Sequence, residues 1–290
     1  MTTTLVRPPS AVGARRSGLV APYVLVLPAL LFLVGFVLVP CVLVIVLSVT
    51  DYNPLTAQAS FVGLDNYRAE IESGELQRGV ANTVRYALLA VPVTVAGGLT
   101  AALAMHELTH LRALWRSIYF VPTATTLISM AIVWRWIFAD HDVLNDPATA
   151  LPALAVVGIW QQTGFATIVF LAALESVPVA RLDAARMDGA PWSSRLRHVV
   201  LPALGPATVF CVVVSALEAL RVFDTVAMIT AGGPEGSTET LTYQMWQRSL
   251  RYFDVGGGAV LTVALLLLTA GFTVVYLLAG GRRAEKAGTR

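Results

Sequence analysis

Charged residues are scarce in this chain, and lysine is nearly missing. Only 13% of the 290 residues are charged, whereas an ordinary soluble domain carries about 25%. A composition so poor in charge is not that of a water-exposed surface. The 20 basic and 18 acidic residues leave a net charge of +2, which is too small an excess to indicate a nucleic-acid partner.

The rarity of lysine and cysteine excludes further kinds of site. The one lysine, Lys286, stands between Glu285 and Ala287, so the Gly-Lys-Ser/Thr core of a phosphate-binding P-loop does not occur. The two cysteines, Cys41 and Cys211, both lie inside long apolar runs. They provide no CxxC pair, zinc-ligand cluster or disulfide framework, and they leave the redox compartment open.

Apolar sequence, by contrast, is abundant, since 56% of the residues are hydrophobic. At a rise of 1.5 Å per residue, a run of about 18 apolar residues crosses the hydrocarbon layer as a helix. The runs are too long for strands and show no alternation. We therefore expect an all-α membrane protein with six transmembrane helices. The expected spans are Pro22 to Val49, Val84 to Met105, Ser117 to Phe138, Leu151 to Leu174, Val199 to Leu220 and Ala259 to Leu278.

The first apolar run follows Arg7, Arg15 and Arg16, as a signal peptide would. A signal peptide has an apolar core of only about 7 to 15 residues, and this run is much longer. We therefore expect it to be retained as a span. The expected organisation is a tail over residues 1–21, a six-helix domain over 22–278 and a second tail over 279–290.

The positions of lysine and arginine predict the orientation, because cytoplasmic loops carry an excess of basic residues. With the amino terminus inside, 13 of the 20 basic residues fall in inner segments. Both termini are therefore expected in the cytoplasm. The loop at residues 175–200 then lies on the inner side, together with Arg181, Arg186, Arg195 and Arg197.

This inner loop, residues 175–200, has the pattern of two short helices joined at a bend. Gly189 can adopt the left-handed conformation that ends a helix, and Pro191 suits the opening turn of the next one. Apolar residues such as Leu182 and Ala185 share one face of the first helix. Periodicity alone leaves two interpretations open, a docking surface for another protein or an amphipathic element lying on the membrane.

The spacing within the loop resembles the cytoplasmic EAA motif of permease subunits in binding-protein-dependent ABC importers. That motif reads Glu-Ala-Ala, two residues, Asp-Gly-Ala, a hydrophobic position and a final Leu-Pro. Here Asp183, one methylene shorter, replaces the glutamate, Leu196 replaces the usual phenylalanine, and Val199 replaces an isoleucine. The matching residues are Ala184, Ala185, Asp188, Gly189, Ala190, Leu201 and Pro202.

The resemblance implies the type I importer permease fold and a role in energy coupling. In that family the motif forms a coupling helix that docks into a cleft on a separate ATP-binding subunit. ATP and magnesium are then expected on that partner, with no cofactor or metal in this chain and no enzyme activity of its own. The expected coupling residues are Asp183, Ala184, Ala185, Asp188, Gly189, Ala190, Leu201 and Pro202.

Two stretches on the expected outer side resemble the permeases of maltose and glycerol-3-phosphate importers. They are Phe61 to Tyr67, and Thr230 to Pro234 with Thr238 downstream. The resemblance implies import of a sugar or sugar derivative, glycerol-3-phosphate-like compounds included, across the cytoplasmic membrane of a prokaryote. It also implies a second, different permease subunit, two ATP-binding subunits and an extracytoplasmic substrate-binding protein as partners.

Polar residues inside the spans are candidates for the substrate path, because placing them in a bilayer is costly. Gln161 and Gln162 lie near the middle of the fourth span, where they either hydrogen-bond a sugar or join neighbouring helices. Glu218, Arg221 and Asp224 recur every three residues near the outer end of the fifth span. They either pair along one helical face or contact the substrate.

Aromatic residues near the expected outer interface also have two interpretations, as rings that stack on a sugar or as anchors in the membrane interface. They are Trp160, Phe223, Tyr243 and Trp246. The histidines form no metal-binding or catalytic pattern, and we expect them to be solvated. They are His106, His110, His141 and His198.

Two other classes of function compete with the importer. A stand-alone secondary transporter or channel should carry paired ionisable residues at the midplane, and only the group around Glu218 comes close. A membrane-embedded enzyme should carry clustered acidic metal ligands or a nucleophile with its base, and the sequence has neither pattern. The permease subunit is therefore the leading prediction.

Overall fold

The computed structural model describes residues 21–107, 112–139 and 142–288. The chain divides between Val44 and Ile45 into two compact units, which are described separately. Helices make up nearly all of the described chain, as the long apolar runs predict. Within it, four helices are long and apolar enough to cross a membrane, and the number rises to six if each of two bent helix pairs counts as one span.

The first unit is built from the first apolar run. Helix α1 (Ala21–Leu33) continues through a π-helical turn, η1 (Val34–Leu38), into α2 (Val39–Ser48), whose last residues belong to the second unit. The segment Leu25–Ser48 is a candidate span of 24 residues. This agrees with the predicted span from Pro22 to Val49.

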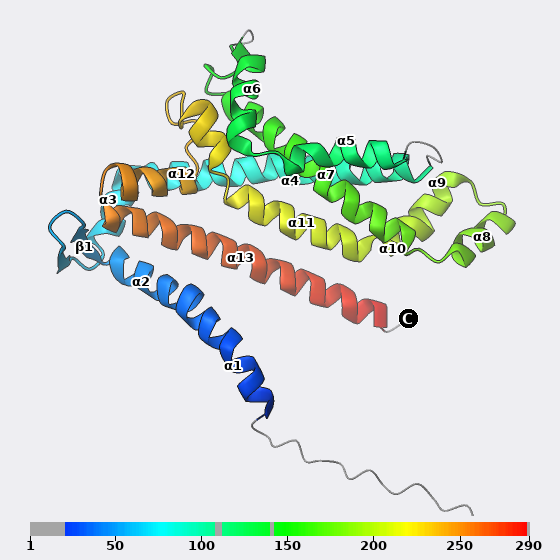
Figure 1. The fold of residues 1–290 in the computed structure, drawn as a ribbon, viewed down its shortest axis with the longest axis horizontal. Coiled ribbons are helices and arrows are strands. Elements are labelled where there is room, and N and C mark those ends of the chain that lie inside the picture. Colours follow the sequence, from blue (N-terminus) through cyan, green and yellow to red (C-terminus); the bar gives the residue numbers. More distant parts are fainter. Residues whose placement is uncertain (1–20, 108–111, 140–141, 289–290) are drawn as a thin grey trace, which may run out of the picture. The chain divides into compact units, whose positions relative to one another are not determined.

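Four long helices run along the second unit and lie side by side (Figure 1). They are α4 (Glu75–Glu107), α7 (Ala150–Glu175), α11 (Gly205–Leu220) and α13 (Val255–Gly288). Helices α4 and α7 make the most extensive contact. Small residues permit this close approach, since a Cβ at Gly98 of α4 would overlap Ala166 of α7. Small residues serve the same purpose at helix contacts inside membranes generally.

Some of these helices extend beyond the apolar runs. Helix α7 agrees with the predicted span to within one residue at each end, but α4 begins at Glu75 rather than Val84, and α13 begins at Val255 rather than Ala259. A helix satisfies its own backbone groups, so it can continue past the hydrocarbon layer with polar residues. Hydropathy therefore marks the apolar part of a helix rather than its ends.

The predicted third span, Ser117 to Phe138, is not one straight helix. Helices α5 (Arg112–Ala124) and α6 (Leu127–Ala139) are separated by a sharp break, across which the chain bends by 98°. At the break the Thr125 hydroxyl donates a hydrogen bond of 2.7 Å to the Pro122 carbonyl, which closes the last turn of α5 locally. The apolar composition continues across the break, so hydropathy did not reveal it.

The predicted fifth span, Val199 to Leu220, also contains a bend. The chain forms α9 (Trp192–Arg195), the π-helical turn η2 (Leu196–Val200) and α10 (Leu201–Ala203), and then turns by 64° into α11. Pro206 lies in the first turn of α11, where its missing N–H is tolerated and where it disfavours a continuous helix from the residues before it. The straight part of this span therefore begins at the bend.

One end of the second unit carries a small sheet that the apolar runs did not predict (Figure 1). Strands β1 (Thr50–Asn53) and β2 (Gln58–Phe61) pair antiparallel, with Thr50 opposite Phe61. Residues 50–74 and 226–254 are called the hairpin end below. Its other elements are α3 (Asp65–Glu72), η3 (Val226–Thr230), α12 (Leu241–Trp246) and η4 (Gln247–Arg251).

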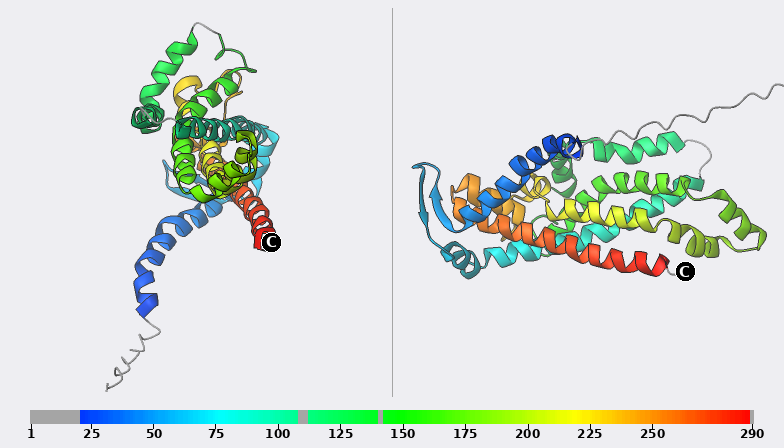
Figure 2. Two further views of the ribbon diagram at one scale, coloured as in Figure 1. Left: turned by 90° about the vertical axis from the view of Figure 1, so that its right-hand side faces the viewer. Right: turned by 90° about the horizontal axis from the view of Figure 1, so that it is seen from below.

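The other end of the long helices carries α8 (Val179–Met187) together with α9 and α10. Residues 176–204 are called the loop end below. Figure 2 shows these helices at the far end of α4, α7 and α11 from the hairpin. The chain therefore places its two non-spanning regions at opposite ends of the second unit.

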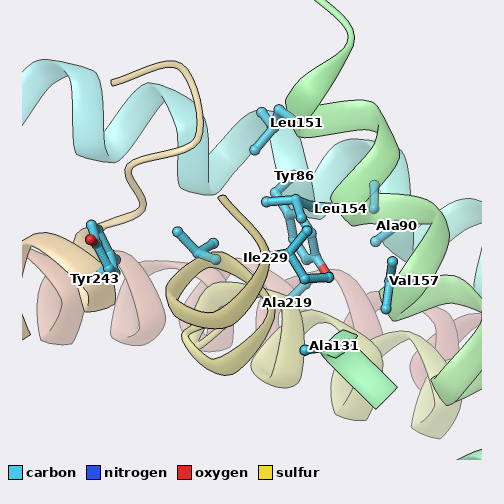
Figure 3. Close-up of a cluster of buried hydrophobic side chains, with 11 residues drawn as sticks. Tyr86, Ala90, Ala131, Leu151, Leu154, Val157, Ala219, Ile229 and Tyr243 are labelled. Carbon is cyan, nitrogen blue, oxygen red and sulfur yellow. The ribbon is translucent and has the colours of Figure 1, made fainter. Parts of the chain in front are cut away.

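Two buried apolar clusters join the long helices. Toward the hairpin end, Tyr86 and Ala90 of α4 pack against Leu154 and Val157 of α7 (Figure 3). The second cluster, centred on Phe170, lies toward the loop end and also contains residues of α4 and α11. Between membrane helices such contacts stabilise by close packing rather than by removal from water.

The predicted tails are only partly described. The amino-terminal tail, residues 1–21, lies outside the described residues except for Ala21. The carboxy-terminal tail, residues 279–290, is helical as far as Gly288, because α13 continues past the predicted end at Leu278.

Candidate functional site

A polar cavity of about 100 Å³ opens between α4, α7 and α11. All four residues predicted for the substrate path line it, Gln161 and Gln162 from α7 and Glu218 and Asp224 from α11 and the residues after it. They are far apart in the chain, so packing of α7 beside α11 is what brings them together. The structure thus assembles one site from two predicted groups, although their role remains a prediction.

Gln161 and Gln162 line this cavity, and within the described chain their side-chain amides have no hydrogen-bond partner. The main-chain carbonyl of Gln161 accepts a hydrogen bond of 2.8 Å from the Thr123 hydroxyl of α5. Neither glutamine side chain hydrogen-bonds to a described residue, so the interhelical bonding considered from the sequence is not found here. Both amides can donate to and accept from a ligand.

Glu218, Arg221 and Asp224 do not form the predicted pairs along one helical face. The described chain shows no ion pair between these three residues. The reason is that α11 ends at Leu220, and Arg221 leaves the helix with φ of −103° and ψ of 13°. The three side chains keep their charges exposed around the cavity.

The cavity contains polar residues that the sequence analysis missed. Tyr86 and Thr94 line it from α4, and Ser215 lines it from α11. Tyr86 fits beside α7 because position 158 is glycine, and a Cβ there would overlap the Tyr86 hydroxyl. The sequence did contain a pattern that could have identified the α4 residues: Tyr86, Ala90 and Thr94 are spaced four residues apart, which places them on one face of a helix.

The aromatic residues divide between packing and the cavity. Phe223, Tyr243 and Trp246 form a cluster with ring centroids 5.8 to 6.4 Å apart, and the buried Tyr243 hydroxyl donates to the Ala231 carbonyl at 2.8 Å. Trp160 packs edge-on against Trp134 at 5.6 Å. Of the four predicted rings, Phe223 lines the cavity, while Tyr243 is part of the folded hairpin end.

The loop end has the predicted helix, bend and helix. Gly189 adopts φ of +70° directly after α8, and the Ala190 N–H bonds to the Ala185 carbonyl at 3.0 Å, which is the left-handed helix ending that glycine favours. Pro191 is the last residue before α9. No atom lies within 4 Å of a Cβ built on Gly189, so backbone conformation rather than crowding selects glycine there.

The loop end is exposed between Val177 and Leu204, which are themselves buried. None of the residues of α8 or α9 is buried, and Met187 is 88% exposed. Asp183 pairs with Arg186 of the same helix at 3.1 Å, with both side chains more than half exposed. Leu182 instead faces a pocket of about 120 Å³ that the ends of α4 and α7 also line. The opposite, exposed face is free to contact another protein.

The two histidines that the structure describes make separate contacts. His106 lines the pocket at the loop end, and His198 contacts Ser194. His110 and His141 lie outside the described residues. Among the described residues, no group of three or more potential metal ligands comes together.

Residues 94–282 match the family model of the binding-protein-dependent transport system inner membrane component. The chain belongs to this family. It is a multi-pass membrane permease of an ABC importer, and the permease subunits of these importers are not themselves enzymes. The resemblance found in the loop sequence is thereby confirmed at the level of the family.

The likeness to individual permeases extends over most of the chain. The trehalose/maltose transport system permease protein MalF of Thermococcus litoralis is 28% identical over 282 residues, which cover 91% of this chain and 94% of that protein. The sn-glycerol-3-phosphate transport system permease protein UgpA of Pectobacterium atrosepticum is 29% identical over 272 residues, which cover 88% and 92%.

A solved structure supports the same architecture. The crystal structure of a bacterial ABC transporter involved in the import of the acidic polysaccharide alginate matches this permease with a TM-score of 0.77. The match covers 90% of this chain and 95% of that chain at 17% identity, so it speaks for the fold alone. This permease therefore has the fold of type I importer permeases.

At the hairpin end of the permease, the first predicted signature is an anchor for the last turn of α2. The Asn66 amide donates to the carbonyls of Ser48 and Thr50, both at 3.0 Å, and the Tyr67 hydroxyl bonds to the Ser48 hydroxyl at 2.8 Å. A Cβ at Gly256 would overlap the Asn66 amide. This signature joins α3 to Ser48 and Thr50 and brings it against the start of α13.

The second signature of the permease, Thr230 to Pro234 with Thr238, forms a loop fastened to itself and to α4. The Thr230 and Thr238 hydroxyls bond at 2.8 Å. The Asn82 amide of α4 donates to the carbonyls of Gly236 and Glu239, both at 3.0 Å. Both signatures therefore have a structural explanation in this chain.

A partly buried ion-pair cluster, which the sequence did not suggest, completes the hairpin end of the permease. Arg248 pairs with Glu75 at 2.7 Å, with Glu70 at 3.2 Å and with Asp254 at 3.4 Å. Glu70, Glu75, Arg248 and Asp254, called the Arg248 cluster, come from α3, α4, η4 and the residue before α13. Their separation along the chain explains why no local pattern revealed them.

Glu70 is the most unusual member of the Arg248 cluster. It is 2% exposed, and its Oε2 atom has no hydrogen-bond partner. Burial raises the pKa of Glu70 above its ordinary value, and the nearby Arg248 charge offsets part of that rise. The cluster therefore contains a carboxyl group that gives up its proton less readily than a solvated one.

Proposed function

We propose that this permease carries a sugar or a sugar derivative inward across the cytoplasmic membrane of a prokaryote, driven by ATP hydrolysed on separate subunits. The proposal is supported by the relatives named for trehalose/maltose and for sn-glycerol-3-phosphate transport. A cavity lined by amides, carboxylates and an aromatic ring suits a ligand rich in hydroxyl groups.

The observation that carries the proposal is the continuity between the loop end and the cavity. The exposed helices α8 and α9 lead through α10 and a 64° bend directly into α11, which bears Glu218. A subunit that binds the loop therefore holds one wall of the cavity through a continuous stretch of chain. The residues that make this contact are Asp183, Ala184, Ala185, Asp188, Gly189, Ala190, Leu201 and Pro202.

The complete importer contains this chain, a second and different permease, two ATP-binding subunits and an extracytoplasmic binding protein that delivers the substrate. ATP and magnesium bind to the ATP-binding subunits. A crystal structure of the alginate transporter in complex with a substrate-bound periplasmic protein supports partners of this kind, since it covers 89% of this chain with a TM-score of 0.73.

In the membrane, each bent helix pair forms one span, so that six spans cross the bilayer. The loop end and both termini lie in the cytoplasm, and the hairpin end lies outside. The excess of arginine in the inner segments supports this orientation.

The test compares two substitutions at Gly189 in the complete importer reconstituted into proteoliposomes. Gly189→Val places a β-branched residue at positive φ, which costs about 1 to 3 kcal/mol and distorts the bend. We expect ATP-dependent uptake to fall by about tenfold or more, because the ATP-binding subunit is released or its hydrolysis no longer drives transport. Gly189→Asn is the matched control, since asparagine tolerates this conformation.

Equal uptake by the valine and asparagine variants, with the ATP-binding subunit still attached, would contradict the coupling role of the loop. Uptake by this polypeptide alone, driven by a proton or sodium gradient, would instead favour the stand-alone transporter. Membrane insertion of both variants is checked by their yield in the membrane fraction, which should equal that of the unmodified chain.

A further inference from the structure

The cavity between α4, α7 and α11 carries more acid than base. Glu218 and Asp224 contribute two carboxylates, and Arg221 contributes one guanidinium group. Among the described residues that line the cavity, these three are the charged ones. The wall that this chain presents to a ligand is therefore net negative.

The two carboxylates form no ion pair or hydrogen bond with the described residues of the chain. Glu218 lies in the last turn of α11, is exposed, and pairs with no described residue. Asp224 follows the helix and is likewise exposed and unpaired within the described chain. Structural carboxylates in this protein behave differently, since Glu70 and Glu75 are held by Arg248 at 3.2 and 2.7 Å. A carboxylate kept unpaired in or near a span is costly unless it has another task.

The neighbouring groups suit hydroxyl donors. Ionised carboxylates only accept hydrogen bonds, so they require a ligand that donates. Gln161 and Gln162 both donate and accept, and the Phe223 ring offers an apolar face beside them. Anionic ligands are usually bound by forked arginine contacts or backbone N–H groups, and this wall supplies one guanidinium against two like-charged carboxylates.

We propose that the cavity accepts a sugar without negative charge, whose hydroxyl groups donate hydrogen bonds to Glu218 and Asp224, and that it rejects sugars bearing phosphate, sulfonate or carboxylate. This inference rests on the proposed function, because it names the class of substrate that the same permease carries. It separates this chain from the relative named for sn-glycerol-3-phosphate and aligns it with the one named for trehalose/maltose.

The experiment uses the complete importer in proteoliposomes and three labelled probes: trehalose, maltose and sn-glycerol-3-phosphate. We expect ATP-dependent uptake of trehalose or maltose and none of sn-glycerol-3-phosphate. Glu218→Gln should lower the initial rate of sugar uptake about 10- to 100-fold, the range for losing hydrogen bonds to a charged group. Glu72→Gln, an exposed carboxylate of α3, is the matched control and should change the rate by less than about twofold.

A third variant, Glu218→Asp, distinguishes an effect of the lost charge from an effect of altered side-chain shape or faulty assembly. It keeps the carboxylate, so its uptake should exceed that of Glu218→Gln while the yield and subunit composition of all three importers stay equal. ATP-dependent uptake of sn-glycerol-3-phosphate would overturn the inference and leave the importer intact. Equal uptake by Glu218→Gln and Glu72→Gln would do the same. If the unmodified importer with ATP takes up none of the three probes, this would count against the proposed function itself.

Discussion

The two ends of the permease are held together in opposite ways. At the hairpin end, side chains bond to distant backbone groups, as Asn82 bonds to Gly236 and Glu239, and the partly buried Arg248 pairs with three carboxylates from other parts of the chain. At the loop end, the described ion pair of α8 lies within that helix and is exposed, and no residue of α8 or α9 is buried. The hairpin end is held by contacts within the chain, whereas the side chains of α8 and α9 at the loop end are largely exposed to solvent.

This difference agrees with the roles proposed for the two ends. A surface that must bind another subunit keeps its polar groups accessible, because contacts already made within the chain would have to be broken on docking. An end that only has to hold helices together can bury its polar groups and satisfy them internally. Substitutions should therefore affect stability at the hairpin end and coupling at the loop end.

The largest effect on stability is expected from Arg248→Met. The change leaves Glu70 buried without a cation and removes the contacts of Glu75 and Asp254 as well. Because Glu70 is buried and the other members are partly exposed, losing the cation should cost up to about 3 kcal/mol, and the midpoint of thermal unfolding in detergent should fall clearly. Arg68→Met is the control, because Arg68 forms an exposed pair with Asp65 and should cost less than about 0.5 kcal/mol.

The Arg248 variant also allows a test of its own explanation. If the loss arises from a stranded carboxylate, adding Glu70→Gln to Arg248→Met should recover part of the lost stability. A double variant as unstable as the sum of the two single variants would show that Glu70 and Arg248 act independently.

A smaller effect is expected from Asn82→Leu. The substitution leaves the carbonyls of Gly236 and Glu239 without their donor, and an unsatisfied buried group costs about 1 to 3 kcal/mol. Gln77→Leu on the same helix removes an exposed amide that bonds to the Ile71 carbonyl, where water can replace it. Equal thermal midpoints for the two variants would argue that the loop is not held through Asn82.

The pH dependence of stability should reveal Glu70. Because its pKa is raised above the ordinary value of 4.5, the folded protein keeps a proton that the unfolded chain has already lost. The free energy of unfolding should therefore be highest below about pH 4.5 and should decrease as pH rises through the raised pKa. In Glu70→Gln this decrease should disappear. Parallel pH curves of the thermal midpoint for the two proteins would contradict this assignment.

The smallest effect on stability is expected at the loop end, from Asp183→Asn. The ion pair with Arg186 is exposed at both side chains, and such pairs contribute between 0 and about 1 kcal/mol. The thermal midpoint should hardly move, whereas ATP-driven uptake should fall if Asp183 contacts the ATP-binding subunit. A large loss of stability would break the contrast between the two ends.

Hydropathy located the spans well, but it did not reveal their shape. The run from Leu151 to Leu174 corresponds to α7 almost residue for residue, because its apolar length and its helix coincide. The breaks near Thr125 and at Leu204 were missed, since the chain remains apolar on both sides of each. Each break depends on one or two residues, such as a hydroxyl group or a proline, and these have little effect on the mean hydropathy of a whole span.

The loop end was predictable for a different reason than the cavity. Gly189 and the residues around it act within a few positions of one another, so their spacing indicated the bend before any tertiary contact was known. Gln161 and Glu218 were identified singly, as polar residues in spans, and only packing of α7 against α11 placed them in one cavity. The pairing of Glu70 with Arg248 had no local signal at all.

Because the chain bends at Leu204, a small rotation of α11 about this bend would produce a large displacement at the other end of the helix. Gly205 and Glu218 are separated by about 20 Å along the helix, at 1.5 Å per residue. A rotation of about 10° about the bend would therefore displace the Glu218 carboxylate by about 3 Å, which is the length of one hydrogen bond. If a tilt of this size is imposed from the loop end, as proposed, it would be enough to break the proposed hydrogen bond between the Glu218 carboxylate and a substrate hydroxyl.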